Sequence, residues 1–151
     1  MSLTRLPNKL LSSPCALVDA KDLASGKHDA LIAEMKELML KHKGIGLAGN
    51  QAGQGLSLFV IDETIAQEYE VPSVFANPEI TDYSRDTEPV EEGCLSIPGF
   101  WTPIRRSKKI MFKGLDGTGK KIKFRARGLL ARVLQHETDH LNGLTIKDRA
   151  E

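Results

Sequence analysis

The sequence predicts an α+β protein in which mostly antiparallel β-sheets pack around a C-terminal, metal-binding helix. Three observations support this prediction: one helical pattern near the start, several short strand-like segments in the middle, and a second helical pattern near the end. Helices separated from a run of strands in this way are typical of α+β folds. The second helical pattern carries His136 and His140, which are the basis of the functional prediction.

The first half of the chain predicts an arm, one N-terminal helix, a loop and a buried strand. Residues 1–20 contain two prolines and are expected to form an irregular arm over the domain. From about Ala20 to Lys43 the apolar residues recur at helical spacing. Residues 44–55 hold five glycines among apolar residues, so we expect a packed loop beside a site rather than a solvated linker. Leu56 to Ile61 is rich in β-branched and aromatic residues and predicts a strand.

The second half predicts strands followed by a helix. Residues 73–80 read as a strand that Pro78 would confine to a sheet edge or end. Residues 89–97 form another extended stretch, and residues 108–125 predict a hairpin because two alternating segments flank an Asp-Gly turn. The last helix is expected from about Gly128 to Asn142, before a capping glycine.

Composition limits the function classes. With 151 residues, of which 40% are hydrophobic and 27% charged, the chain is expected to form one globular domain, residues 1–151. A net charge of +1 gives no overall field for nucleic acid, and we interpret the basic run Arg105–Lys109 as a solvated strand edge. Two cysteines favour a reducing compartment, and no apolar run reaches the roughly 18 residues of a membrane span. We expect a cytoplasmic protein, with an organelle as the alternative because Leu3–Leu11 is basic.

The candidate chemistry lies in the segment Gln135–Gly143. On a helix, His136 and His140 share one face and can bind one metal ion, with Glu137 beside them as a candidate proton acceptor. A catalytic site of the zinc type needs three protein ligands and an open position. Only eleven residues follow His140, and Ile146 stands where some metallopeptidases carry a further histidine. The third ligand is therefore expected upstream.

Cys94 is the best candidate for that third ligand. It follows a glycine in a short turn-like stretch, whereas the competing donors Cys15, His28 and His42 lie in the arm or on a solvated helix face. Two imidazoles and one thiolate would leave a divalent metal with an open position, where the pKa of bound water falls toward about 7. Glu137 could accept the proton from that water.

Two further groups could bind the oxygen of a carbonyl substrate. Gln51 is an uncharged polar side chain near the end of the glycine-rich loop, and its amide can donate to such an oxygen. The backbone N–H of Leu95, next to Cys94, could complete an oxyanion site.

Three segments, residues 44–51, 92–96 and 135–140, resemble the signature motifs of peptide deformylases in the order found in that family. The similarity extends over nearly the whole chain. It implies hydrolysis of the formyl group from N-formylmethionine at the start of nascent polypeptides. It also implies that Cys94, His136 and His140 hold the metal, that Glu137 is the general base and acid, and that Gln51 and the Leu95 N–H hold the formyl oxygen.

The resemblance also implies how substrate and metal are bound. Gly46 would form a backbone hydrogen bond with the peptide, and Ile45, Leu129 and Val133 would line the pocket for the methionine side chain. The metal would be a divalent ion, Fe2+ in the cell, with Zn2+, Ni2+ or Co2+ able to replace it. The implied partners are the formylmethionyl nascent peptide and, transiently, the ribosome, without direct nucleic-acid or membrane contact. Gly49 replaces the alanine usual in the family, which we expect to loosen the loop that carries Gln51.

Two alternatives remain from the residues alone. A metallopeptidase or another amidase could use the same three ligands. An inactive paralogue could bind peptide N-termini without catalysis, although every catalytic residue type is present. Formate release from formyl-Met peptides separates deformylation from both.

Overall fold

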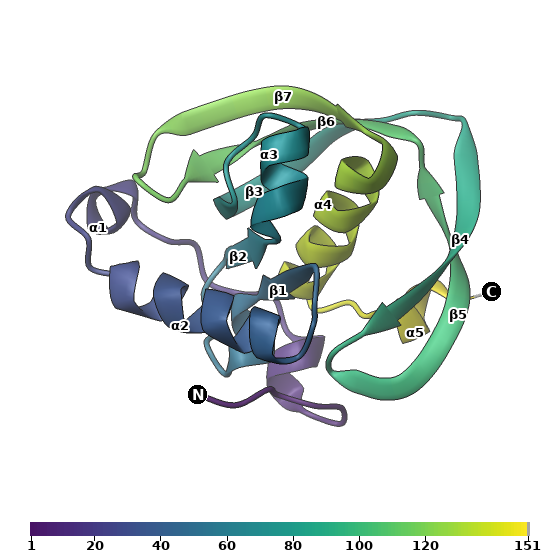
Figure 1. Ribbon diagram of the computed structural model, residues 1–151, viewed down its shortest axis with the longest axis horizontal. Coiled ribbons are helices and arrows are strands. Elements are labelled where there is room, and N and C mark those ends of the chain that lie inside the picture. Colours follow the sequence, from purple (N-terminus) through teal and green to yellow (C-terminus); the bar gives the residue numbers. More distant parts are fainter. Residues whose placement is uncertain (151) are drawn as a thin grey trace.

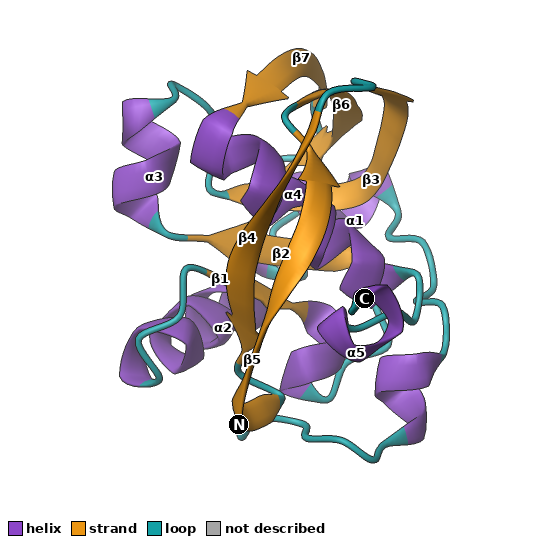
Figure 2. Ribbon diagram, turned by 90° about the vertical axis from the view of Figure 1, so that its right-hand side faces the viewer, coloured by secondary structure: helices purple, strands orange, loops and turns teal. Residues whose placement is uncertain are grey.

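Two antiparallel sheets surround helix α4 (Gly128–Leu141) in the computed structural model, which describes residues 1–150 (Figures 1 and 2). The larger sheet has the strand order β1-β2-β3-β6-β7, and β4 pairs with β5 in the smaller one. The larger sheet comprises β1 (Gly46–Ala48), β2 (Leu58–Ile61), β3 (Val74–Tyr83), β6 (Lys109–Asp116) and β7 (Lys121–Arg127). The smaller comprises β4 (Thr87–Cys94) and β5 (Ile97–Ser107). The α+β architecture predicted from the sequence is confirmed.

The remaining helices are short apart from α2. They are α1 (Ala20–Ala24), α2 (Asp29–Lys41), α3 (Glu63–Glu68), α5 (Ile146–Arg149) and the 3-10 helices η1 (Lys9–Ser12) and η2 (Gly49–Ala52). None of the helices within residues 1–150 is long and apolar enough to cross a membrane. The sequence patterns did not predict α3, α5 or the long strand β5.

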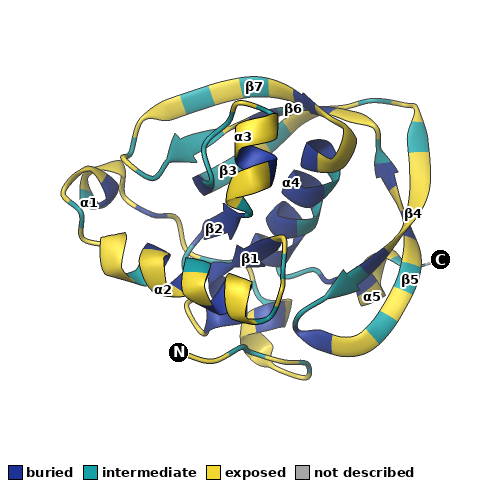
Figure 3. Cartoon of the chain, in the orientation of Figure 1, coloured by how far each residue is buried: buried dark blue, intermediate teal, exposed yellow. Residues whose placement is uncertain are grey.

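Helix α4 is buried on more than one face, as the dark-blue segments of Figure 3 show. Its apolar residues, including Leu130 and Leu134, pack on the larger sheet in one cluster with Phe59, Phe75 and Phe112. The phenylalanine rings lie 5.2–6.3 Å apart, at distances typical of aromatic packing. Because this contact fixes the helix, its polar face is presented to the β4–β5 hairpin.

The predicted N-terminal helix is interrupted. Helix α1 ends at Ala24 and α2 begins at Asp29, with Gly26 between them at a φ of +82°. This left-handed conformation ends a helix, and glycine adopts it without steric cost. Apolar periodicity alone did not reveal the break.

The prediction that Pro78 keeps its strand at a sheet edge or ends it is wrong, because β3 continues to Tyr83. Strand β3 pairs with both β2 and β6 and lies in the middle of the larger sheet. The register shifts between Ala76 and Glu79, and Asn77 has a φ of +51°, so Pro78 falls in a bulge. A bulge is one of the few places in a sheet where the missing N–H of proline is tolerated.

The N-terminal arm is tied to two elements that carry site residues. The Thr4 N–H donates to the Gln51 carbonyl at 2.7 Å, and the Leu6 N–H donates to the Ser96 carbonyl at 3.1 Å. Gln51 lies in η2, and Ser96 lies in the turn between β4 and β5. The arm therefore connects the glycine-rich loop with the hairpin turn.

Candidate metal centre and active-site cleft

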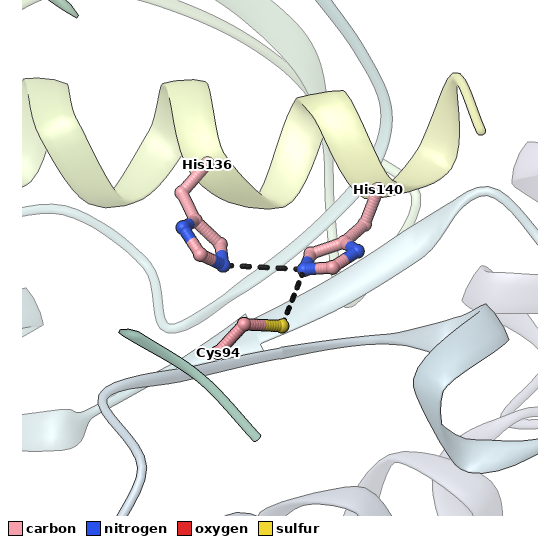
Figure 4. Close-up of side chains that lie close together, drawn as sticks. All are labelled: Cys94, His136 and His140. Carbon is pink, nitrogen blue, oxygen red and sulfur yellow. Dashed lines mark hydrogen bonds between the residues drawn. The ribbon is translucent and has the colours of Figure 1, made fainter. Parts of the chain in front are cut away.

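Three metal-ligand atoms converge between α4 and the end of β4 (Figure 4). His136 and His140 lie one turn apart on α4, and Cys94 is the last residue of β4. The His140 Nε2 atom lies 3.1 Å from His136 Nε2 and 3.3 Å from Cys94 Sγ. All three ligand atoms lie within 4.8 Å of one another, and this is the one such group in the part of the chain that the structure describes.

The spacing of these atoms fits a single transition-metal ion. Zinc-type bonds to nitrogen and sulfur place tetrahedral ligands about 3.3 Å apart for two nitrogens and about 3.6 Å for nitrogen and sulfur. The observed separations of 3.1 and 3.3 Å are within a few tenths of an ångström of these values. Three protein ligands of this kind leave one position for water or substrate, as in catalytic sites.

The electrostatic surroundings of the two histidines favour a cation between them. Burial, with a contribution from His136, holds the pKa of His140 well below its ordinary value, so this ring is a neutral ligand. Burial opposes a charge on His136, but Glu137, Cys94 and Glu92 outweigh it and raise the pKa of His136 to about 10. The same negative groups that attract a proton to this ring would stabilise a bound metal ion.

Glu92 orients the ligand His136 and was not assigned a role from the sequence. Its Oε1 atom lies 2.9 Å from His136 Nδ1, the ring atom that points away from the other two ligands. Burial raises the pKa of Glu92, but hydrogen bonds from His136 and Arg106 outweigh it and lower the pKa to about 2. Glu92 stands two residues before Cys94 on one strand, so both side chains face α4. This spacing is the sequence signal that could have identified it.

Arg106 connects Glu92 with Asp139. Its guanidinium donates to both Glu92 oxygens at 2.8 and 3.0 Å and to Asp139 Oδ2 at 2.8 Å. Arg132 also donates to Glu92, and Arg149 donates to Asp139. The interpretation of the basic run as a solvated edge is wrong for Arg106, which is 6% exposed. Asp139 therefore accepts hydrogen bonds from two arginines, Arg106 and Arg149.

Glu137 is a buried carboxylate beside the metal ligands. Its side chain is 4% exposed, Oε2 lies 4.0 Å from His136 Nε2, and Oε1 has no hydrogen-bond partner within residues 1–150. Burial raises the pKa of Glu137 to about 7, although His136 and Arg106 oppose the shift. Gly46 makes room for it, since a Cβ atom at that position would lie 2.5 Å from Oε2. A carboxylate with such a pKa suits proton transfer near neutral pH.

Gln51 faces Cys94 from η2. Its Nε2 atom donates to Cys94 Sγ at 3.4 Å and to Ser96 Oγ at 3.1 Å, and its Oε1 accepts from the Ala48 N–H at 3.0 Å. Ser96, which the sequence had not suggested, thus positions the amide. The expectation that Gly49 loosens this loop is not supported, because a Cβ atom there would lie 2.5 Å from the Leu56 carbonyl oxygen. Glycine instead allows η2 to pack closely on the following segment.

A cleft of about 610 Å3 opens at the metal centre. It brings together nearly all the residues predicted from the sequence: Ile45, Gly46, Gln51, Cys94, Leu95, Leu129, Val133, His136 and Glu137. His140 is buried behind them, 1% exposed. Ile45 and Leu129 are large apolar residues that are 48% and 44% exposed, as expected where an apolar ligand binds.

Trp101 forms part of the rim of this cleft. It is 65% exposed and faces Gly93 across the β4–β5 ladder. A Cβ atom at Gly93 would lie 2.7 Å from the indole ring, so the ring rests directly on the backbone next to Cys94.

The sequence matches known proteins over its whole length. The family model described as polypeptide deformylase matches residues 1–151. A peptide deformylase of Thermodesulfovibrio yellowstonii is 40% identical over 149 residues, which cover 99% of this chain and 88% of that protein. A peptide deformylase of Dictyoglomus turgidum is 46% identical over 121 residues, covering 80% of this chain and 74% of the relative.

Solved structures agree with this assignment. The crystal structure of peptide deformylase from Thermotoga maritima has a TM-score of 0.88 at 34% identity and covers 99% of this chain and 96% of that one. The peptide deformylase from Synechococcus elongatus, solved in complex with actinonin, has a TM-score of 0.88 at 36% identity. The match covers 100% of this chain and 79% of that one. The chain belongs to the polypeptide deformylase family of hydrolases.

Proposed function

We propose that this chain hydrolyses the formamide bond of N-terminal formylmethionine in nascent polypeptides, with Glu137 as the proton-transfer group. The observation that carries the proposal is the position of Glu137, which is buried in the cleft, 4.0 Å from the His136 Nε2 atom. One of its oxygens has no hydrogen-bond partner among the described residues 1–150. A divalent ion held by Cys94, His136 and His140 would supply an acidified water and polarise the formyl oxygen.

The chain's own residues supply the proton transfers. Glu137 accepts the proton of the attacking water and then donates it to the nitrogen of the departing amine. Its raised pKa of about 7 keeps both protonation states accessible near neutral pH. Gly46 has no side chain that would displace the carboxylate from this position.

Two donors are assigned to the formyl oxygen. The Gln51 amide would exchange one of its present acceptors, Cys94 or Ser96, for that oxygen. The Leu95 N–H lies in the two-residue turn after Cys94 and would donate from the hairpin side. Donors from two elements would hold the formyl group against the Glu137 carboxylate.

The apolar side chains of the cleft are assigned to the methionine side chain. Ile45, Leu129 and Val133 line the cavity that contains Glu137. Strand β1 is an edge strand of the larger sheet, so Gly46 can pair with an extended peptide through its backbone. We expect actinonin, the ligand of the Synechococcus elongatus relative, to compete with peptide for this cleft.

The metal and the cellular setting follow from the family resemblance. Two imidazoles and one thiolate can bind Fe2+, Zn2+, Ni2+ or Co2+, so the ligand types do not identify the metal. We assign Fe2+ as the cellular ion on the family resemblance. A cytoplasmic location with transient contact to the ribosome would bring the cleft to emerging chains.

The decisive experiment measures formate release from formyl-Met-Ala-Ser by anaerobically purified protein, with metal analysis of the same sample. We expect turnover with about one metal ion per chain. Glu137→Ala should keep the metal and lower kcat by about 10²- to 10⁴-fold, which is the usual contribution of a general base. Glu68→Ala, an exposed glutamate on α3, is the matched control. Faster hydrolysis of unblocked Met-Ala-Ser would indicate a peptidase, and unchanged activity of Glu137→Ala would remove the proposed role.

A further inference from the structure

Two cations from separate elements line the cleft. Arg5 comes from the N-terminal arm, and Lys43 follows the end of α2. The carboxylates that line the same cleft, including Glu91, come instead from β4 and α4. We propose that Arg5 and Lys43 select substrates by charge, favouring formylmethionyl chains with an acidic residue shortly after the methionine. This inference rests on the proposed function.

Lys43 occupies a backbone position that favours glycine. Its φ is +56°, its N–H donates to the Leu40 carbonyl at 3.1 Å, and the Gly44 N–H donates to the Met39 carbonyl at 2.9 Å. These bonds define a helix C-terminus whose left-handed residue is usually glycine, because a Cβ atom is disfavoured there. The chain keeps a lysine at this strained position, and its side chain lines the cleft. Backbone stability would favour glycine at this position, so it does not explain the presence of lysine.

Backbone hydrogen bonds of the two residues that flank Arg5 hold it at the cleft. The neighbouring Thr4 and Leu6 N–H groups donate to the carbonyls of Gln51 and Ser96, at 2.7 and 3.1 Å. Both acceptors belong to segments that form the active site. Within residues 1–150, neither Arg5 nor Lys43 forms an ion pair with an acidic side chain. Both charges are therefore available to a ligand.

The distance along the cleft suits the residues that follow methionine. Gly46 adjoins Glu137, where the formyl group reacts, and Lys43 is three residues away, at most about 11 Å along the chain. A peptide that runs from Gly46 toward Lys43 advances about 3.3–3.6 Å per residue, which brings its second and third residues within reach of the long Lys43 side chain. An acidic side chain there would pair with Lys43 or Arg5, and a basic one would be repelled.

The test compares formyl-Met-Ala-Asp-amide with formyl-Met-Ala-Lys-amide, whose blocked ends leave only the third side chain to differ in charge. Exposed ion pairs change an equilibrium by about 1.4- to 5-fold each, so we expect the kcat/KM ratio of the Asp to the Lys peptide to be about three- to tenfold. High salt should reduce the ratio, since the Debye length falls to about 3 Å at 1 M.

Charge-removing variants identify the residues responsible. Arg5→Gln and Lys43→Gln should each lower the ratio, and the double variant should bring it close to one. Lys43→Gly should lower it as well while raising the thermal midpoint, because glycine suits a φ of +56°. Lys41→Gln is the matched control: Lys41 is an exposed cation at the end of α2 that does not line the cleft, and the ratio should stay at the wild-type value.

A wild-type ratio of one or less, or an unchanged ratio in the double variant, would overturn the charge selection. Formyl-Met-Ala-Ser distinguishes this failure from failure of the proposed function. Turnover of that neutral peptide without a preference between the charged ones rejects only the role of Arg5 and Lys43. Absence of turnover for all three peptides by metal-loaded protein rejects the proposed function itself.

Discussion

Replacing Arg106 by methionine should strongly destabilise the protein. Arg106 is 6% exposed and binds Glu92 and Asp139, which are 7% and 9% exposed, at 2.8–3.0 Å. Methionine keeps most of the volume but leaves two buried carboxylates without their shared cation. Breaking a buried pair in this way costs about 3–5 kcal/mol. Arg132 and Arg149 still bind the two acids, so we expect the lower end, about 3 kcal/mol.

Urea-induced unfolding of the chelator-treated protein measures this loss without a contribution from metal binding. The corresponding fall in Tm is about 6–12 °C, at 2–4 °C per kcal/mol for a chain of this size. Lys108→Met is the control, because Lys108 pairs with Asp86 at 3.6 Å on the surface and its loss should cost less than about 1 kcal/mol. A loss below about 1 kcal/mol for Arg106→Met would refute the view that this guanidinium compensates the buried acids.

The contacts of Glu92 with His136 and Arg106 predict a pH dependence. The pKa of Glu92 is lowered from 4.5 to about 2 in the folded protein, so the ionised carboxylate stabilises the fold fully at pH values above its ordinary pKa of 4.5. That stability is lost as the pH falls through the folded value. The difference between wild type and Arg106→Met should therefore shrink between about pH 5 and pH 2. A difference that is constant over this range would contradict the assignment.

Three further predictions concern the metal and the loop beside it. Glu92→Gln should weaken metal binding about 10- to 100-fold in chelator competition, because it removes the carboxylate that orients His136; unchanged affinity would exclude that role. Gly49→Ala should destabilise the protein by about 1–3 kcal/mol in urea unfolding, since the methyl group would lie 2.5 Å from the Leu56 carbonyl oxygen. Gly55→Ala, whose Cβ atom would meet nothing nearer than 3.8 Å, is the control, and equal effects would argue against a steric cause. Removing the metal with a chelator should lower Tm, because an ion at 100 times its Kd stabilises the fold by about 2.7 kcal/mol. Cys94→Ala should abolish the difference in Tm between metal-loaded and chelator-treated protein. A chelator effect of equal size in that variant would point to another metal site.

The metal ligands were readable from the sequence because local geometry determines most of their arrangement. His136 and His140 share a helix face by their spacing alone, and the requirement for one more donor selected Cys94. The surrounding network was not readable, since Arg106 meets Glu92 and Asp139 only after β5 packs against β4 and α4. A run of basic residues on a strand suggests a solvent-exposed edge, but alternate side chains of a strand point to opposite faces, so some of them can be buried.

Backbone features limited the prediction of the fold in a similar way. The break at Gly26 divides a segment whose apolar residues fit one helix. Pro78 suggested a sheet edge, but a bulge accommodates it inside the sheet. Both outcomes depend on tertiary contacts that local propensity does not contain.

The position of Trp101 gives the protein an intrinsic optical probe. It is the sole tryptophan of the chain, and its indole rests on Gly93, the residue before the thiolate ligand. Excitation at the long-wavelength edge of the protein absorption band, where tyrosine does not absorb, therefore produces fluorescence from Trp101 alone, at the rim of the cleft. Loading of a paramagnetic ion at Cys94, or entry of a peptide, changes the solvent and quenching environment of this one fluorophore. Occupancy of the site can thus be titrated in unlabelled protein, independently of turnover.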